Sequence, residues 1–351
     1  MVKIHSSFTG GNILIKEQNG NNYLLENDLS KNTNDWFYWA FCVEGAEGKE
    51  LTFSFDKRRV GYYGPAVSYD LTNWHWLDSC DGDSFTYNFK ENETKVYFAH
   101  SMLYHPERFY EFAKEKGIEV KELCKSKKGR SVPCFTLGNG ETSVILTSRH
   151  HACESTGNFV LEGVIDELVR NPIENATVFC VPFVDYDGVI DGEQGKFKAP
   201  YDHNRDYAIG ATRIYPETER IIKYADEHGC NYGFDFHSPG HFGRVNDNLF
   251  LVRNDIAGNE RFDMLGEEIE KNLNDKAMKY SKENDFPANT DWNTGTAHFS
   301  YNMVIRPECH IACTLETTYF GTEDNKISDE KLVEFGRCFA KAMKGYISKT
   351  R

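Results

Sequence analysis

The feature that most constrains the fold is the alternation of apolar, strand-like runs with amphipathic helical segments from about residue 134 onward. Apolar runs are found at 143–147, 178–184, 233–237, 248–252 and 309–315. Helical periodicity is found at 159–169, 217–228, 261–276 and 329–347. Strands that alternate with helices build a parallel or mixed sheet with helices on its faces. We therefore predict an α/β fold with a mixed central sheet and flanking helices.

Residues 1–115 have a different texture, rich in aromatic side chains and turn formers. Short apolar runs lie at 12–16, 36–43, 50–55, 84–89 and 95–99, separated by Gly, Asn and Asp clusters. This pattern is typical of antiparallel strands, and it predicts a smaller β-sandwich before the α/β part. A helix is expected from Pro106 to about Lys125, followed by an exposed connector. For 351 residues two domains are expected, and we place them at 1–126 and 127–351.

Composition excludes several kinds of partner. The chain has 40 Lys and Arg against 54 Asp and Glu, a formal charge of -14, whereas nucleic-acid binding needs a basic surface. No apolar stretch has the length of a signal peptide or a membrane span. The 10 cysteines occur without CxxC pairs, which favours reduced thiols over a disulfide framework. We therefore expect a cytoplasmic protein that binds neither nucleic acid nor membranes.

One predicted strand runs directly into a polar turn that carries His151 and Glu154, an HxxE spacing. Zinc accepts imidazole nitrogen and carboxylate oxygen, and a catalytic zinc site has three protein ligands and one open position. The three-residue spacing lets both side chains reach one ion from a tight turn. Such a pair is also common by chance, so it needs support from elsewhere in the chain.

A second short apolar strand ends in His237, which is followed by a Ser-Pro-Gly turn. Asp235 lies two residues earlier on the same strand face, where its carboxylate can orient an imidazole. A lone His in this setting is more often a satisfied core residue than a ligand. Functional groups gather past the carboxyl ends of parallel strands, however. Two strand-end sites in one sheet therefore strengthen the hypothesis of a shared metal ion.

Two further segments carry candidate binding and catalytic groups. The adjacent Asn204 and Arg205 offer an amide and a forked guanidinium, which suit recognition of a carboxylate; a solvated turn is the alternative. Glu316 ends an apolar strand, where a carboxylate is costly unless it is paired or used. Partial desolvation would raise its pKa toward the range of a general base; a structural ion pair is the alternative.

In their order along the chain, these segments resemble the zinc metallocarboxypeptidases, and within them the cytosolic carboxypeptidase branch. The segments that correspond to HPGE, NPDGV, DLNRN, DLHGHS and TLEAS of that branch are His151-Ala-Cys-Glu, Asp185-Tyr-Asp-Gly-Val, Asp202-His-Asn-Arg-Asp, Asp235-Phe-His-Ser-Pro-Gly-His and Thr314-Leu-Glu-Thr-Thr. The aromatic N-terminal region is similar to the β-sandwich of the same branch. The resemblance covers most of the chain and implies a carboxypeptidase-like fold.

The resemblance also implies roles for individual residues. His151, Glu154 and His237 would hold one zinc ion per chain, and Glu316 would be the general base toward a metal-activated water. Asn204 and Arg205 would bind the terminal carboxylate of the substrate. A further role, stabilisation of the oxyanion, is filled in the family by an arginine between the HxxE turn and the Asn-Arg pair. This chain has no arginine there after Arg170; Lys196 is the nearest equivalent and Lys198 the second.

Other departures concern specificity. His298 stands where the cytosolic branch tends to carry an arginine that favours acidic side chains, so a preference for glutamate is not implied; Arg244 and Arg306 are alternative cations. Tyr301 is the candidate for the tyrosine that other carboxypeptidases move over the substrate, and Tyr319 is the alternative.

Three hypotheses follow for the function. The leading one is a carboxypeptidase that hydrolyses C-terminal residues of peptides or protein tails, so that a peptide or protein C-terminus is the partner. The alternative is a zinc amidohydrolase acting on N-acyl amino acids or cell-wall peptides with the same metal centre. The third is a non-catalytic binding protein, against which the presence of Glu316 argues. Zinc content and turnover of C-terminally varied peptides distinguish the three.

Overall fold

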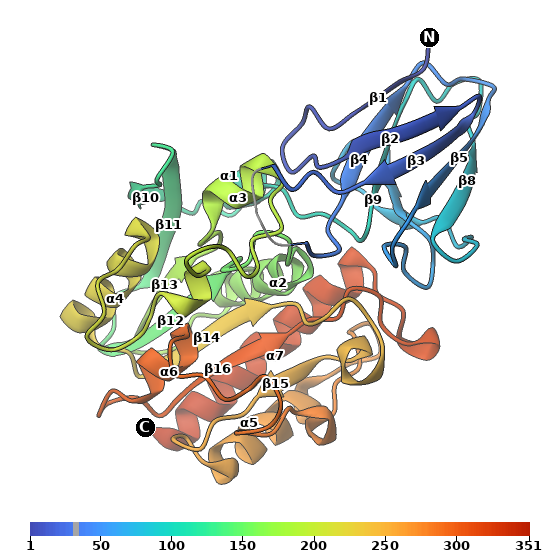
Figure 1. Cartoon of the computed structure of the whole chain (residues 1–351). Coiled ribbons are helices and arrows are strands. Elements are labelled where there is room, and N and C mark those ends of the chain that lie inside the picture. The colour runs from blue at the N-terminus through green and yellow to red at the C-terminus, as the bar shows by residue number, and fades with distance from the viewer. Residues whose placement is uncertain (31–34) are drawn as a thin grey trace.

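The computed structural model describes residues 1–30 and 35–351. The described residues form three sheets, two in the N-terminal third of the chain and one of seven strands in the remainder. Figure 1 shows the N-terminal sheets, in blue, beside the larger α/β part. The predicted fold class is confirmed: a β-sandwich precedes a mixed sheet with flanking helices. The predicted boundary between residues 126 and 127 stays a prediction.

The N-terminal unit consists of two facing sheets. One has the order β1-β4-β9-β6-β7 and the other β2-β3-β5-β8. The strands are β1 (Lys3–His5), β2 (Leu14–Asn19), β3 (Asn22–Glu26), β4 (Ala40–Glu44), β5 (Glu50–Phe55), β6 (Ala66–Ser68), β7 (His75–Trp76), β8 (Ser84–Asn88) and β9 (Lys95–Ala99). All pairs are antiparallel except β3 with β5, which are parallel.

Aromatic side chains fill the space between these two sheets. Trp39, Phe41, Phe53, Phe85 and Phe98 are almost completely buried in one cluster, and the ring centroids of Phe41 and Phe53 are 5.1 Å apart. Large rings bury much apolar area for each residue, so a short sandwich obtains a core of its own. The packing between the two sheets therefore explains why this part of the sequence is rich in aromatic residues.

The predicted helix 106–125 is wrong in its second half. Helix α1 (Pro106–Glu115) ends before Gly117, which has a φ of 68°, a conformation that favours glycine. The chain then forms β10 (Lys121–Lys125), which pairs antiparallel with β11 (Ser131–Gly138). The segment expected to be a connector is therefore the turn of a β-hairpin, and this hairpin belongs to the seven-stranded sheet.

The large sheet has the order β10-β11-β13-β12-β14-β16-β15. Its inner strands β13 (Ala176–Val181), β12 (Thr142–Ser148), β14 (Tyr232–His237) and β16 (Ile311–Glu316) are parallel neighbours, and β15 (Phe250–Val252) closes one edge antiparallel. The remaining α-helices are α2 (Thr156–Arg170), α3 (Tyr186–Asp191), α4 (Pro216–His228), α5 (Asn259–Asn272), α6 (Phe299–Val304) and α7 (Asp329–Thr350). Parallel strands align their carboxyl ends, so the β12, β14 and β16 termini lie side by side.

Helix α7 packs against both α2 and α5. The α2–α7 contact is unusually close: a Cβ on Gly336 would lie 2.0 Å from the carbonyl oxygen of Val160, and one on Gly163 would lie 1.9 Å from that of Val333. Only glycines allow two helix backbones to approach this far. None of the helices in the described part of the chain combines the length and apolar character needed to cross a bilayer.

This close contact yields a stability prediction. Gly336→Ala is expected to lower the free energy of unfolding by about 1–3 kcal/mol, because the added methyl meets rigid backbone and forces the helices apart. Urea unfolding followed by circular dichroism measures the change. Gly345→Ala in the same helix is the control, since its Cβ would meet only the end of the Glu268 side chain. Equal stability of Gly336→Ala and wild type would contradict the rigid contact.

Candidate metal centre

The carboxyl ends of three neighbouring strands carry the candidate catalytic side chains. β12 leads into the turn that holds His151 and Glu154, β14 ends at His237, and β16 ends at Glu316. The register pairs Ser148 with Phe236 and His237 with Glu316, which brings residues distant in sequence to one edge of the sheet.

The turn after β12 is held in shape by Arg149. This residue has a φ of 60°, an unfavourable region for a residue with a side chain. Its buried guanidinium donates from Nε to the carbonyl oxygen of Ala152 (2.9 Å) and from Nη1 to that of Tyr104 (3.1 Å). These bonds stabilise the bend that projects His151 and Glu154 toward β14.

His151, Glu154 and His237 form one compact group. Nδ1 of His151 lies 2.8 Å from Oε1 of Glu154, and Nδ1 of His237 lies 2.6 Å from Oε2. The donor atoms all lie within 4.8 Å of one another, and all three side chains are buried. Burial opposes ionisation of Glu154, but His151, Lys196 and His237 together hold its pKa well below the usual range. Two imidazole nitrogens and an ionised carboxylate at this spacing fit a metal ion.

The remaining nitrogen of each imidazole faces a second carboxylate. Nε2 of His237 is 2.6 Å from Oδ2 of Asp235, and Nε2 of His151 is 3.4 Å from Oδ1 of Asp202. Carboxylates in these positions orient a ligating imidazole and leave its other nitrogen free for the metal. The contact between Asp235 and His237 is the one that the sequence led us to expect. The carboxylate of Asp202 beside His151 was not indicated by the sequence.

His150 forms a competing group with Asp235 and His237. Its Nδ1 is 2.9 Å from Oδ1 of Asp235, and its Nε2 is 2.8 Å from the hydroxyl of Tyr207. Both nitrogens are therefore engaged, and the ring is fully buried. His151, His237 and Glu316 line a cavity, but His150 does not. The group open to a ligand is thus the one containing His151.

Glu316 is a buried carboxylate next to this group. It lines the cavity, and its Oε2 has no hydrogen-bond partner among the described residues. Desolvation raises the pKa of Glu316 to about 7; the nearby charges of His237 and Lys196 lower it, and that of Glu154 raises it. A cavity-lining carboxylate with a raised pKa and an oxygen that has no hydrogen-bond partner among the described residues is suited to accept and return a proton.

The two candidate lysines lie in different places. Nζ of Lys196 donates to Oε1 of Glu154 at 2.8 Å and lines the cavity. Nζ of Lys198 instead pairs with Asp185 (3.0 Å) and Glu193 (2.6 Å) away from that cavity. Burial lowers the pKa of Lys196, but the charges of Glu154 and Glu316 outweigh it and raise the pKa to about 12. Lys196 is therefore a permanent cation beside the candidate metal group.

The cavity has a volume of about 300 Å³, and Asn204 and Arg205 form part of its wall. Both belong to the short 3-10 turn at His203–Arg205. Oδ1 of Asn204 accepts a hydrogen bond from the backbone N–H of Phe299 (3.0 Å), which fixes the amide, and Nη1 of Arg205 donates to the carbonyl oxygen of Asn204 (3.0 Å). Arg205 thus contributes a guanidinium to the wall of the cavity that His151 and His237 also line.

The remaining predicted substrate residues differ in position. His298 lines the cavity, whereas Tyr301 lines a neighbouring hollow together with His298. Tyr319 is fully buried, with its hydroxyl 3.9 Å from Sγ of Cys153, and it does not line the cavity. Neither Arg244 nor Arg306 lines the cavity. The structure therefore places only His298 of this set on the wall.

The N-terminal sandwich contributes directly to the cavity through Trp36. Its ring lies 5.3 Å from Nζ of Lys196 and 5.5 Å from the ring of Phe197. The side chain of Gln194, two residues before Lys196, makes two bonds to the backbone of Tyr38: Oε1 accepts from its N–H (2.9 Å) and Nε2 donates to its carbonyl oxygen (2.8 Å). The segment that contains Trp36 and Tyr38 thus holds the loop that carries Lys196.

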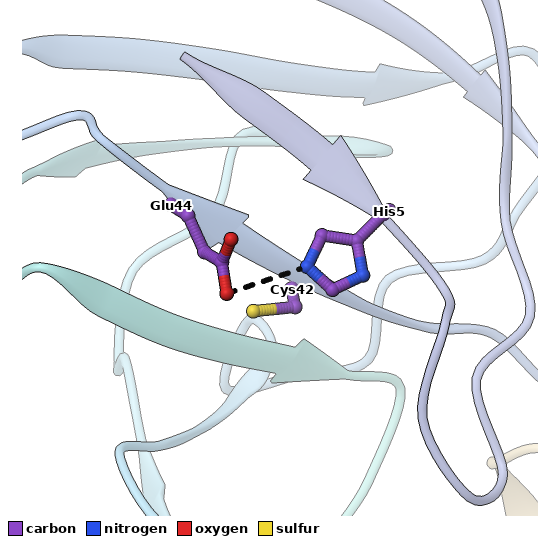
Figure 2. Close-up of side chains that lie close together, drawn as sticks. All are labelled: His5, Cys42 and Glu44. Carbon is purple, nitrogen blue, oxygen red and sulfur yellow. Dashed lines mark ion pairs between the residues drawn. The ribbon is translucent and has the colours of Figure 1, made fainter. Parts of the chain in front are cut away.

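A second group of possible ligands lies on the sandwich. Figure 2 shows His5 on β1 with Cys42 and Glu44 on β4. Glu44 is already paired, with Oε1 3.1 Å from Nζ of Lys95 and 3.6 Å from Nε2 of His5. Nδ1 of His5 accepts the N–H of Ser7 (3.2 Å), which leaves the proton on Nε2, toward Glu44. Burial raises the pKa of the Cys42 thiol to about 12. This group is therefore an ion-pair network rather than a metal site.

Comparison with known proteins places these observations in a family context. Residues 4–100 match the family model described as the cytosolic carboxypeptidase N-terminal domain. An uncharacterised protein of Zymomonas mobilis is 26% identical over 345 residues, covering 92% of this chain and 89% of that protein. Cytosolic carboxypeptidase 3 of Bos taurus is 26% identical over 181 residues, covering 42% of this chain and only 18% of that longer protein.

A solved structure shares the fold over the whole chain. It is a metallo-carboxypeptidase from Pseudomonas aeruginosa in complex with (2-guanidinoethylmercapto)succinic acid, with a TM-score of 0.82 and 19% identity over 99% of this chain and 100% of that one. The resemblance inferred from the sequence is thereby confirmed. The chain is a distant homologue of the cytosolic carboxypeptidases and has the fold of bacterial metallo-carboxypeptidases.

Proposed function

We propose that this protein is a zinc-dependent carboxypeptidase that removes C-terminal residues from peptides or protein tails. One observation carries the proposal: a buried group of two imidazoles and a carboxylate has both imidazoles on the wall of a cavity that is also lined by Arg205 and by Glu316, whose Oε2 has no hydrogen-bond partner among the described residues. A hydrolase that recognises a free C-terminus needs these three components close together.

His151, Glu154 and His237 would hold the zinc ion. When bound, zinc would act as a Lewis acid toward water and the scissile carbonyl. The donor set supports one ion per chain because each imidazole has one nitrogen beside the carboxylate of Asp235 or Asp202 and the other directed at Glu154. The composition, two nitrogens and one carboxylate oxygen, is that of a catalytic zinc site with an open position.

The other site residues would each have a separate role in binding the substrate or in the reaction. Arg205 and Asn204 would bind the terminal carboxylate and so place the last peptide bond next to Glu316. Glu316 would accept a proton from the attacking water and return it to the nitrogen of the departing residue. Lys196, held beside Glu154 at 2.8 Å, would offset the negative charge that develops on the carbonyl oxygen.

Two further findings support this assignment. The Pseudomonas aeruginosa protein with the same fold was solved with a succinic acid derivative, and carboxylate binding by Arg205 is consistent with that ligand chemistry. All 10 cysteines are free thiols in the structure, which supports a reducing, cytoplasmic setting.

The size of the cavity favours one alternative. About 300 Å³ is at the lower limit of ordinary ligand pockets, and it suits a small N-acyl amino acid or a cell-wall peptide fragment as well as the end of a longer peptide. The alternative is therefore a zinc amidohydrolase with the same metal group. The test is a panel of free peptides, the same peptides with amidated C-termini, and N-acyl amino acids. Turnover of N-acyl amino acids alone would select the alternative, and turnover of amidated peptides as fast as that of the free peptides would refute both.

The metal assignment gives a separate prediction. The purified protein is expected to contain one zinc per chain by elemental analysis, and His237→Ala is expected to bind zinc at least about 100-fold more weakly, because one of three protein ligands is lost. His310→Ala is the control, since His310 lies outside the metal group. Full zinc occupancy in His237→Ala would contradict the assignment.

A further inference from the structure

The cavity wall contains few charges that a substrate side chain could use. Among the described residues it includes two side chains that are always cationic, Lys196 and Arg205. Lys196 is already bound to Glu154 at 2.8 Å. Under the proposed function, Arg205 binds the terminal carboxylate of the substrate and is therefore not available to a substrate side chain. An acidic side chain on the last residue would therefore find no cation of its own on the described wall.

Apart from the proposed metal ligands His151 and His237, His298 is the remaining basic group on the described wall, and its hydrogen bonds fix it as neutral. Nδ1 accepts the backbone N–H of Tyr301 (3.2 Å), so it carries no proton, and the hydroxyl of Ser300 lies 2.9 Å from the same atom, where it can donate as well. Nε2 lies 2.8 Å from the carbonyl oxygen of Gly295 and must donate to it. Both ring nitrogens are thus satisfied by groups of the same segment, two of the backbone and the Ser300 hydroxyl. Burial and the nearby charge of Arg205 agree with this, since they lower the pKa of His298 to about 4.

The other side chains that line this cavity around His298 are uncharged; of the charged groups in the neighbouring hollow, Arg253 is paired with Asp263 and Asp285, and Asp255 accepts a hydrogen bond from Asn289. The uncharged residues that line the cavity here are Val252, Trp292, Asn293, Ser300 and Thr314. The one carboxylate on the described wall is Glu316, which the proposed mechanism uses as the base. A Lys or Arg side chain would therefore have no partner except the catalytic group. Placing a charge in the cavity without a partner, where it loses part of its hydration, is unfavourable.

We propose that the cavity selects substrates whose C-terminal residue has an uncharged side chain, and that His298 is a specificity-determining residue because it lines the cavity as a neutral ring. This inference rests on the proposed function. It names the substrate class and predicts discrimination against both acidic and basic termini.

The test compares peptides that differ only in the charge of the last side chain. A peptide ending in Gln is expected to be hydrolysed with a kcat/KM at least about tenfold higher than its Glu counterpart, and one ending in norleucine higher than its Lys counterpart by a similar factor. The same order of affinity is expected by calorimetry with the zinc-loaded Glu316→Gln protein. Equal or better use of the Glu peptide would overturn the inference and leave the carboxypeptidase assignment intact. Absence of turnover on every peptide would overturn both.

A variant tests the role of His298 itself. His298→Arg places a cation on the wall and is expected to raise the Glu-to-Gln ratio of kcat/KM by about tenfold or more. Ile209→Arg adds the same charge at an exposed position outside the cavity and is expected to leave the ratio unchanged. Because His298 also caps α6, Ser300→Arg serves as a second variant if the first does not fold. An unchanged ratio in a folded His298→Arg protein would refute the assigned role.

Discussion

Glu316→Gln is expected to reduce kcat by about 100- to 10,000-fold, the usual contribution of a positioned general base, while zinc stays bound. The substitution keeps the size of the side chain and removes its ability to take a proton. Glu316 lies outside the group of His151, Glu154 and His237, so zinc occupancy is expected to remain at one per chain. Single-turnover kinetics and elemental analysis of the same preparation measure the two effects.

A buried carboxylate elsewhere provides the control for this prediction. Glu217 is 2% exposed on α4, with Oε2 3.8 Å from Nε2 of His203, and Glu217→Gln is expected to retain the wild-type kcat. Retained activity in Glu316→Gln would remove Glu316 as the base. Loss of zinc along with activity would instead indicate that Glu316 belongs to the metal group.

The strands that build the site could be predicted because their sequences are simple. β12, β14 and β16 are short apolar runs bounded by polar or glycine-containing turns, and the structure places them within a few residues of the predicted ranges. Their common direction follows from the intervening helices. Since parallel strands align their carboxyl ends, the meeting of His151 with His237 could be inferred before any coordinates.

The hairpin β10–β11 could not be predicted in the same way. β10 has the sequence Lys-Glu-Leu-Cys-Lys and is mostly exposed at an edge of the sheet, so it lacks the alternation of a half-buried strand. Its charged residues also continue the helix-like composition of α1. Edge strands are often charged for this reason, and their sequence then carries little information about strand pairing.

The contacts between the N-terminal sandwich and the α/β part could not be predicted from the sequence either. Trp36 fits the aromatic pattern of the sandwich, yet its ring lines the cavity near Lys196. Gln194 has no motif around it, and its two bonds to Tyr38 depend on how the sandwich rests on the α/β part. Sequence position alone favours Lys196 over Lys198 only slightly. In the structure Lys196 lines the cavity, whereas Lys198 pairs with Asp185 and Glu193.

Through these contacts the sandwich would help to position Lys196 for the proposed reaction. Asn12 adds a further link, since its Nδ2 donates to the carbonyl oxygen of Gly192 at 2.7 Å. The loop that carries Lys196 is therefore held by hydrogen bonds to the sandwich, and the Lys196 side chain itself is held by Glu154. Preorganised charge of this kind lowers the cost of stabilising a developing oxyanion.

Arg205→Ala is expected to lower kcat/KM for peptides with a free C-terminus by about 100- to 1,000-fold, because a charge-assisted, forked hydrogen bond to the terminal carboxylate is lost. Peptides with an amidated C-terminus lack that carboxylate, so their low turnover is expected to be the same in variant and wild type. Steady-state kinetics on matched free and amidated peptides measures both effects.

Two further variants, one at Arg205 itself and one at a neighbouring arginine, test whether the effect depends on the guanidinium of Arg205. Arg205→Lys is expected to recover part of the loss, since an ammonium supplies the charge without the fork. Arg213→Ala removes a nearby guanidinium that binds backbone carbonyls of Asp206 and Ala208 and does not line the cavity, and it is expected to keep the preference for free C-termini. If Arg205→Ala hydrolysed free and amidated peptides in the wild-type ratio, Arg205 would not be the carboxylate-binding residue. The exopeptidase specificity would then have to arise from another cation, of which Lys196 is the nearest on the described wall.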